Sequence, residues 1–185
     1  WVRFVKTQYP DMVKNLSTAK SPQQMFGAMS KTYIAQKLGI DPSKVFSLSI
    51  MPCVAKKYER AVPQVNDSGR GSDVDLVLTT RELDSFIRSD SIKPEDLTDV
   101  PFDSIFGEGS GAGVIFGTTG GVMEAALRSA YYMVAGKNPD ADAFKNVRGN
   151  KGWREHTFNL KGNKLNVAVA TGLANARALI EAVRA

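Results

Sequence analysis

The stretch that decides the fold is Val45-Phe-Ser-Leu-Ser-Ile-Met-Pro-Cys-Val-Ala-Lys-Lys-Tyr-Glu59. Its first half, Val45 to Met51, is apolar enough to predict a largely buried β-strand. Pro52 ends this strand, and the only cysteine of the chain, Cys53, follows directly. Two lysines come close behind the cysteine. The stretch therefore predicts a strand that delivers one thiol into a basic, loop-like exit.

Helix signals lie before this strand and after a second one. Ser21 can cap a helix that has Pro22 at its first position, and Gln24 can close a capping box. Asp73 to Leu78 predicts another strand, and Thr79-Thr-Arg-Glu82 forms a second capping box that opens a short helix. The other expected elements are the rest of the first helix to Gly39, a weak helix from Val2 to Val13 interrupted at Pro10, a helix from Val122 to Val134 ended by Gly136, a hairpin of Trp153 to Leu160 with Leu165 to Ala170, and a last helix from Leu173.

Strands that alternate with helices predict an α/β fold with a mainly parallel β-sheet flanked by helices. Ligands of such sheets bind beyond the carboxyl ends of the strands. Cys53 follows one predicted strand, and Gly117 follows the apolar stretch Val114-Ile-Phe116, which we interpret as another. Both residues are therefore expected at the ligand-binding edge.

Composition narrows the class of protein. The 185 residues suit one domain, with room for two small lobes, and 43% hydrophobic with 23% charged residues is ordinary for a globular chain. No stretch approaches the roughly 20 apolar residues that span a bilayer. The net charge of +5 is spread out, which favours a solvated basic surface and no nucleic-acid partner. A single cysteine excludes an internal disulfide and fits a reducing compartment, so we expect a cytoplasmic protein.

Taken alone, Cys53 has several interpretations. A free cysteine is often a buried, inert core residue. The nearby Lys56 and Lys57 favour the thiolate, which is both the nucleophile and the metal ligand. A nucleophile needs a base, but the only histidine, His156, lies far along the chain in a strand-like alternation. One cysteine and one histidine are too few for structural zinc, and an iron–sulfur cluster normally takes four thiolates.

A glycine-rich run is the second chemical candidate. Seven of the fifteen residues from Gly107 to Gly121 are glycine. Such a run lets backbone N–H groups approach an anion, and the helix expected from Val122 adds its positive end. A flexible, closely packed loop is the alternative. Neither the dinucleotide-binding fingerprint nor the P-loop pattern fits the run.

Several strings resemble the iron-only ([FeFe]) hydrogenases. Met51-Pro-Cys-Val-Ala-Lys-Lys-Tyr-Glu59 resembles the second signature of that family, and residues 111–128, from Gly111-Ala-Gly-Val-Ile-Phe116 onward, resemble its glycine-rich segment. Shorter matches are Asn15 to Gln24, Leu78 to Leu83 and Asn146 to Gly149. The resemblance covers essentially the whole chain in order. Residues 1–185 are therefore identified as part of one hydrogenase catalytic domain.

The resemblance implies a cofactor, the H-cluster. In the family this is a [4Fe–4S] cubane joined through a cysteine sulfur to a two-iron unit with CO, cyanide and a dithiolate bridge, and it reduces protons to H2 reversibly. By resemblance, Cys53 is a cubane ligand, and Lys56 donates to a cyanide and pairs with the carboxylate of Glu59. The other implied site residues are Ser17 in the proton path, Ser21 at a cyanide, Pro22 and Gln23 near the diatomic ligands, Met51 and Phe116 as pocket walls, and Gly117 beside them.

The resemblance also sets limits on what this sequence can do alone. In the family, a Thr-Ser-Cys-Cys-Pro segment would precede Trp1 and an Ala-Cys-x-Gly-Gly-Cys segment would follow Ala185, and they would supply the other three cubane ligands. We therefore expect the 185 residues alone to lack the H-cluster and to be inactive. The resemblance implies a parent protein with ferredoxin or a similar electron carrier, and maturation proteins, as partners.

Two other classes of function remain open at this point. Relatives of the family act in iron–sulfur protein assembly or hydrogen sensing without significant H2 turnover. Ser21, Lys56 and Phe116 favour a hydrogenase over that class, because these residues serve the two-iron unit. A basic nucleic-acid-binding module is the third class, and it rests on charge alone.

Overall fold

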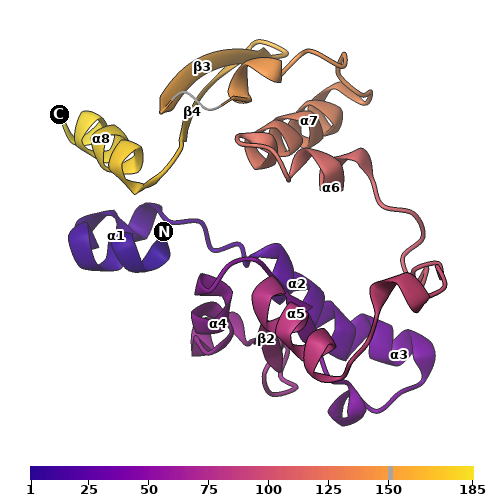
Figure 1. The fold of residues 1–185 in the computed structure, drawn as a ribbon. Helices are drawn as coiled ribbons and strands as arrows, with labels where there is room; N and C mark the ends of the chain where they lie inside the picture. The colour runs from indigo at the N-terminus through magenta and orange to yellow at the C-terminus, as the bar shows by residue number, and fades with distance from the viewer. Residues whose placement is uncertain (150–151) are drawn as a thin grey trace. The chain divides into compact units, whose positions relative to one another are not determined.

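The structure is a computed structural model that describes residues 1–149 and 152–185. These residues form two compact units (Figure 1). The cysteine unit is Ser17–Ile105, and the glycine unit combines Trp1–Leu16 with Phe106–Ala185. Each unit contains helices and a two-stranded sheet, so the α/β fold is confirmed.

A continuous helix opens the cysteine unit. Its parts are α2 (Pro22–Met29), the π-helical turn η2 (Ser30–Ile34) and α3 (Ala35–Leu38). At its start, the N–H of Gln24 donates to Ser21 Oγ at 3.4 Å. At its end, Gly39 has φ +64°, a left-handed conformation that glycine adopts without steric cost. Both helix limits confirm the sequence prediction.

The prediction of a capping box at the start of this helix is wrong. Gln24 is fully buried, and its side-chain amide has no hydrogen-bond partner within residues 1–149 and 152–185. The side chain therefore does not reach back to the N-cap residue. Burial of the first turn has overridden the local pairing that the sequence pattern favours.

The parallel sheet of the cysteine unit pairs β1 (Leu48–Ile50) with β2 (Leu76–Leu78), with Leu48 opposite Leu76. Both strands are shorter than predicted. One face of β1 lies on α2, because the Ser49 hydroxyl bonds to a residue of that helix. The opposite face carries Leu48 and Ile50, which are 48% and 45% exposed. The prediction of a largely buried strand is therefore wrong for these two side chains.

Short helices complete the cysteine unit. α4 (Ala55–Arg60) follows the cysteine, and α5 (Thr80–Ser89) follows β2. The capping box predicted for α5 is confirmed: Glu82 N–H donates to Thr79 Oγ1 at 3.2 Å, and Thr79 N–H donates to Glu82 Oε2 at 2.8 Å. Three described 3₁₀ turns of this unit have proline at the first position. η3 (Pro42–Lys44) precedes β1, η4 (Pro63–Val65) lies between α4 and β2, and η5 (Pro94–Asp96) follows α5.

The glycine unit has two small cores. Val5, Tyr9 and Ile180 are buried where α1 (Val2–Gln8) meets α8 (Leu173–Arg184). The second core packs α7 (Gly121–Ala135) on a hairpin through Leu127, Phe144, Val147 and Leu160. The remaining elements of this unit are η1 (Pro10–Asn15), α6 (Gly111–Ile115), η6 (Lys145–Val147), β3 (Trp153–Leu160) and β4 (Asn163–Ala170).

The predicted hairpin is confirmed, but its second strand begins at Asn163, two residues earlier than predicted. Leu160 pairs with Asn163, so the two loop residues are Lys161 and Gly162, with φ of +49° and +93°. Two consecutive positive φ values match a type I′ turn, whose twist suits antiparallel strands. His156 lies within β3 opposite Val167, as its strand-like alternation with neighbouring residues predicts.

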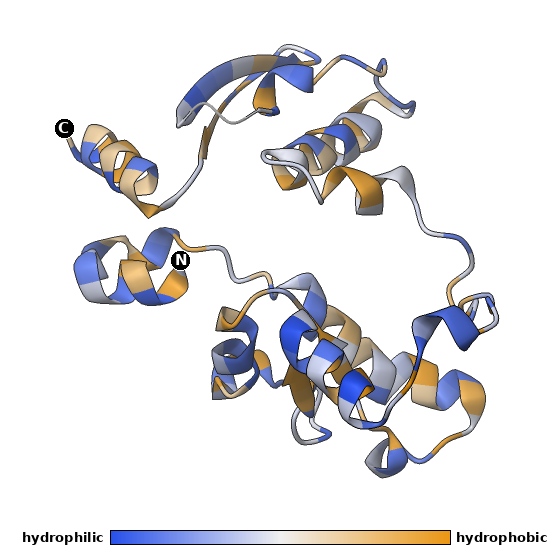
Figure 2. Ribbon diagram, viewed as in Figure 1, coloured by the Kyte–Doolittle hydropathy of each residue, from blue (hydrophilic) through white to orange (hydrophobic). Residues whose placement is uncertain are grey.

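The strand interpretation of Val114 to Phe116 is wrong. Residues 111–115 form the helix α6, and the N–H of Phe116 donates to the carbonyl of Ala112 at 3.0 Å. Figure 2 shows this apolar helix next to the more polar segment that precedes it. A three-residue apolar run has too little periodicity to separate a strand from a helix. Gly117 therefore follows a helix, and it does not lie at the end of a strand.

Candidate functional site

Cys53 lies on the turn between β1 and α4, and its side chain is exposed. The N–H of Met51 donates to the carbonyl of Leu78 at 2.9 Å, which is the last bond between the two parallel strands. The carbonyl of Cys53 then accepts from the N–H of Lys56 at 3.1 Å. The thiol thus stands at the carboxyl end of a parallel strand, as predicted, and the interpretation as a buried core cysteine is wrong.

Gln23 connects three elements of the cysteine unit. Its side chain is buried, with 7% of the residue exposed. The hydroxyl of Ser49 on β1 donates to Gln23 Oε1 at 2.7 Å. Gln23 Nε2 donates to the carbonyl of Lys56 on α4 at 3.4 Å. One side chain from α2 therefore fixes the strand before the cysteine and the helix after it.

Lys56 and Glu59 form an ion pair on α4. The distance from Lys56 Nζ to Glu59 Oε2 is 2.5 Å, and both side chains are about a quarter exposed. The i, i+3 spacing puts the two groups on one helix face. The predicted pairing of these residues is confirmed. The ion pair holds the Lys56 ammonium near the first turn of α4, where Gln23 contacts the Lys56 carbonyl.

The position of β1 depends on a buried ion pair. Lys31 is 4% exposed, and its ammonium donates to Asp75 Oδ1 at 2.7 Å and to the carbonyl of Ser72 at 2.6 Å. The other carboxylate oxygen of Asp75 accepts from the N–H of Ser47 at 2.7 Å. Asp75 therefore ties the helix to Ser47, the residue directly before the strand that carries Ser49.

A second ion pair fixes the start of α2. Lys20 Nζ lies 2.7 Å from Oδ2 of Asp73, which is fully buried, and it also contacts Asp67. Burial acts to raise the pKa of Asp73, but the Lys20 ammonium and hydrogen bonds from Ser68 together outweigh it and hold that pKa below its usual value. Gly27 packs so closely on Asp73 that a Cβ there would overlap the Asp73 carbonyl. The chain around Ser21 is thus fastened to the loop before β2.

Other predicted site residues are placed with fewer contacts. Ser17 is exposed, and its Oγ accepts from the N–H of Ala19 at 3.1 Å. Pro22 is exposed at the first position of α2, and Met51 is half-buried after β1. The structure brings together Gln23, Lys56 and Glu59 of the predicted set. Ser49 was missed, although strand alternation places it on the face of Met51.

The last two predicted residues, Phe116 and Gly117, belong to the glycine unit. Phe116 is 42% exposed after α6. A Cβ on Gly117 would meet only the Val114 carbonyl, at 3.5 Å, an ordinary contact. The run regains packing at Gly121, where a Cβ would overlap the Ile115 carbonyl. Packing within this unit therefore does not explain a glycine at position 117.

A buried carboxylate follows the glycine-rich run. Glu124 on α7 is fully buried and accepts from Arg148 Nη2 at 2.7 Å and from Arg128 Nε at 3.1 Å. The Arg148 guanidinium, followed by that of Arg128, lowers the pKa of Glu124 despite its burial. This ion cluster joins α7 to the segment after η6 and fixes the end of the run.

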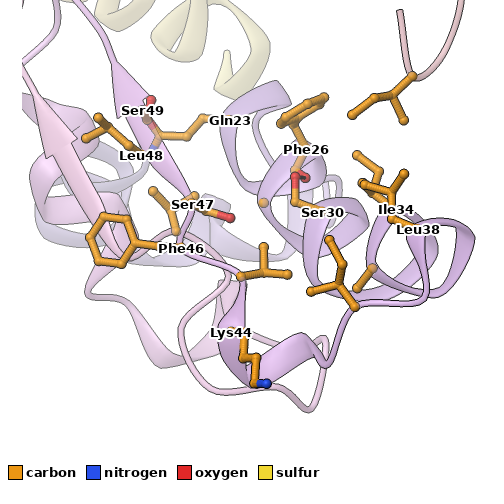
Figure 3. Close-up of a pocket in the computed structure, with 16 residues that line it drawn as sticks. Gln23, Phe26, Ser30, Ile34, Leu38, Lys44, Phe46, Ser47, Leu48 and Ser49 are labelled. Carbon is orange, nitrogen blue, oxygen red and sulfur yellow. Dashed lines mark hydrogen bonds between the residues drawn. The ribbon is translucent and has the colours of Figure 1, made fainter. Parts of the chain in front are cut away.

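A cavity of about 470 Å³ lies between the long helix and β1 (Figure 3). Gln23 and Ser49 border it, and apolar side chains such as Phe26, Ile34 and Leu48 make up much of its wall. Cys53 and Lys56 do not line it. Gln23 and Ser49 thus lie between an apolar space and the turn that carries the thiol.

The donor groups near Cys53 can be compared with those that an iron–sulfur cluster requires. No group of three or more His, Cys, Asp or Glu side chains in residues 1–149 and 152–185 is arranged to hold a metal ion. A [4Fe–4S] cluster takes four thiolates, and the sequence contains only Cys53. The exposed thiol fits one ligand position, and the amide of Gln23 and ammonium of Lys56 fit an anionic group beside it. No described helix has the length and apolar character needed to cross a membrane.

Comparison with known proteins gives the same family along the whole chain. The family model "Iron only hydrogenase large subunit, C-terminal domain" matches residues 1–185. The periplasmic [Fe] hydrogenase large subunit of Nitratidesulfovibrio vulgaris is 46% identical over 185 residues, which are all of this chain and 44% of that protein. The NADP-reducing hydrogenase subunit HndD of Solidesulfovibrio fructosivorans is 48% identical over 98% of this chain and 31% of its own length.

A more distant relative and a solved structure also match nearly the whole of this chain. The cytosolic iron-sulfur assembly component 3 of Pongo abelii is 30% identical over all of this chain and 40% of its own length. The solved structure of apo [FeFe]-hydrogenase HydA1 from Chlamydomonas reinhardtii superposes with a TM-score of 0.73 at 36% identity, covering 98% of this chain and 52% of that one. The chain thus spans about half or less of these relatives. It belongs to the iron-only hydrogenase family, and residues 1–185 match the family model of the C-terminal domain of the large subunit.

Proposed function

We propose that the protein carrying these residues is an iron-only hydrogenase, which reduces protons to H2 and oxidises H2 at an H-cluster. The observation that carries the proposal is the Gln23, Lys56 and Glu59 arrangement beside an exposed Cys53, within a chain that matches the family throughout. The H-cluster, when bound, supplies the redox chemistry and the iron that binds hydrogen. The residues of this chain bind, orient and shield it.

We assign a separate role to each group of residues in this chain. Cys53 provides one thiolate to the cubane, so three further ligands must come from outside these 185 residues. Lys56 donates a charge-assisted hydrogen bond to an anionic ligand, and Glu59 holds the ammonium in place. The remaining members are Ser17 in the proton path, Ser21, Pro22 and Gln23 at the diatomic ligands, and Met51, Phe116 and Gly117 as pocket walls.

An iron–sulfur assembly factor is the second candidate, because a named assembly component matches all 185 residues of this chain. Sequence identity favours the hydrogenase, at 46% and 48% for two named hydrogenases against 30% for that component. An assembly factor would bind iron and sulfide without turning over H2. Turnover therefore separates the two candidates.

The proposal extends to partners and compartment. A ferredoxin or similar carrier delivers electrons, and maturation proteins insert the two-iron unit; protons and H2 are the small substrates. We place the protein in the cytoplasm because the reduced thiolates that the proposed cluster needs suit a reducing compartment. One relative is named periplasmic, so fractionation of the producing cells is the measurement that tests this placement.

The test is hydrogen evolution by the complete protein after maturation, with a reduced carrier as electron donor. We expect the natural protein to evolve H2. Lys56→Ala should lose most of this activity. Lys57→Ala is the matched control, because Lys57 pairs with Glu82 on α5 and not with Glu59. Iron and sulfide binding with no H2 from the natural protein would favour the assembly factor.

A further inference from the structure

The hydrogen bonds of Gln23 define which way round its amide lies. The carbonyl of Lys56 can only accept, so the Gln23 atom that faces it, at 3.4 Å, must be Nε2. Oε1 then faces Ser49, whose hydroxyl donates to it at 2.7 Å. The Lys56 carbonyl therefore sets the orientation of the amide, and the Ser49 hydroxyl, which can donate or accept, acts as a donor in that orientation. The shorter bond comes from Ser49, a residue to which we have so far given no role at the site.

Ser49 is itself held in place. It is the middle residue of β1, paired with Val77 on β2. The strand is fixed to the long helix through Asp75, which accepts from both Lys31 and the N–H of Ser47. The hydroxyl of Ser49 therefore reaches Gln23 from a rigid position. Four residues later the same segment presents Cys53.

We propose that Ser49 is a positioning residue: it holds the Gln23 amide so that Nε2, and not Oε1, is turned toward the Lys56 end of the site. Nε2 carries two N–H groups, and the Lys56 carbonyl takes one. The second is then available to donate to an anionic diatomic ligand bound beside Lys56. This inference rests on the proposed function, because the ligand belongs to the H-cluster.

Loss of the Ser49 hydroxyl removes the stronger of the two restraints. In Ser49→Ala, the buried Oε1 has no donor, which favours rotation of the amide or entry of water from the adjoining cavity. An amide that has turned over presents lone pairs to the anionic ligand in place of an N–H. The residues that touch the cluster are unchanged in this variant, so its effect passes through Gln23.

The chain offers a matched control and a rescue. Ser47 lies on the same strand face two residues earlier, and its Oγ is buried without a hydrogen-bond partner among the described residues. Ser47→Ala therefore removes an equal group that does not contact Gln23. Ser49→Thr keeps the hydroxyl, and the cavity beside Ser49 has room for the added methyl group.

The first measurement is made on the complete protein before cluster insertion. Exchange of the Gln23 side-chain N–H protons with solvent is followed by NMR. We expect about tenfold faster exchange in Ser49→Ala, the factor that corresponds to one lost hydrogen bond, and no change in Ser47→Ala or Ser49→Thr. Equal exchange rates in Ser49→Ala and the natural protein would overturn the positioning role.

The second measurement is made after maturation, by infrared spectroscopy of the CO and cyanide stretching bands. We expect a shifted cyanide band in Ser49→Ala and in Gln23→Ala, and unshifted bands in Ser47→Ala and Ser49→Thr. A shift in Gln23→Ala with none in Ser49→Ala would overturn the inference and leave the proposed function standing. A natural protein that shows no such bands after maturation would overturn the proposed function itself.

Discussion

The two segments that carry the candidate residues are held in different ways. In the cysteine unit, Gln23 is bonded to Ser49 and Lys56, and the start of α2 is fastened by Lys20 and Asp73. In the glycine unit, a Cβ on Gly107, Gly109, Gly111 or Gly113 would meet nothing within 4 Å. That run becomes packed only at its end, at Gly120, Gly121 and Glu124.

The difference distinguishes residues that are explained by contacts within their own unit from residues that such contacts do not explain. Contacts within the cysteine unit account for the orientation of its polar site residues. Contacts within the glycine unit account for the end of the glycine run but not for its open glycines or for the exposure of Val114, which is 80%. Substitutions at the packed positions should therefore lower the stability of the fold. Substitutions at the open positions should leave the protein folded.

The largest expected effect is at the packed end of the run. Glu124→Ala leaves Arg148 and Arg128 without their buried partner, so we expect a loss of about 3 kcal/mol, the low end for a broken buried pair because Arg148 is half-exposed. Native-state hydrogen exchange of α7 amides measures it. Asp142→Ala breaks an exposed pair with Lys145 and should change the stability by less than about 1 kcal/mol. Similar losses in both variants would contradict this account.

A pair of glycine substitutions tests the contrast within one run. Gly121→Ala places a Cβ against the Ile115 carbonyl and should cost about 2 kcal/mol. Gly113→Ala lies in α6 with open space around it and should gain about 0.5 kcal/mol from the better helix propensity of alanine. The same exchange measurement reports both. A loss in Gly113→Ala as large as that in Gly121→Ala would remove the distinction between open and packed glycines.

The ion pair that fastens α2 should make the cysteine unit sensitive to acid. The pKa of Asp73 is lowered below 3.8 in the folded chain, so its contribution is present above that value and is lost as the pH falls through the folded pKa. The pKa of Lys20 is raised above 10.5, so its contribution is complete below that value and is lost at higher pH. Asp73→Asn should cost about 1.5 kcal/mol at pH 7 and much less near pH 2.

Exchange of the α2 amides at the two pH values measures this dependence. Asp67→Asn is the control, because Asp67 also pairs with Lys20 but its side chain is 68% exposed. It should shift the exchange much less than Asp73→Asn. A loss in Asp73→Asn that is the same at pH 2 and pH 7 would show that the charge of Asp73 does not contribute.

The smallest expected effect lies away from the site. The Lys57 ammonium, followed by hydrogen bonds from the N–H and hydroxyl of Thr79, lowers the pKa of Glu82 to about 2. A carboxyl titration by NMR should find this midpoint. Lys57→Ala should raise it toward the usual value of 4.5, without moving the exchange of the Gln23 amide. A midpoint near 4.5 in the natural protein would contradict the pairing.

Local signals in the sequence predicted the elements well. The Thr79–Glu82 capping box, Gly39 and Gly136 at helix ends, and the hairpin all depend on a few neighbouring residues, and each is found. The same locality explains one failure: the three apolar residues from Val114 to Phe116 carry no period, and they form a helix in place of the predicted strand.

Long-range contacts could not be predicted in this way. The Lys56–Glu59 pair has helical spacing and was expected, whereas Ser49 lies 26 residues from Gln23 and has no spacing that points to it. Glu124 and Arg148 are separated by 24 residues, and the Lys20–Asp73 pair by 53. Burial of Gln24, which prevents the predicted capping box, likewise depends on elements distant in sequence.

The central claim is that Cys53 supplies one cluster thiolate at the turn where Gln23 bonds to Lys56. The most direct measurement is the iron and sulfide content of the matured complete protein, with its H2 evolution, compared between the natural protein and Cys53→Ala. The account predicts a cluster and H2 from the natural protein, and loss of both in Cys53→Ala. Full iron content and undiminished H2 evolution in Cys53→Ala would contradict it.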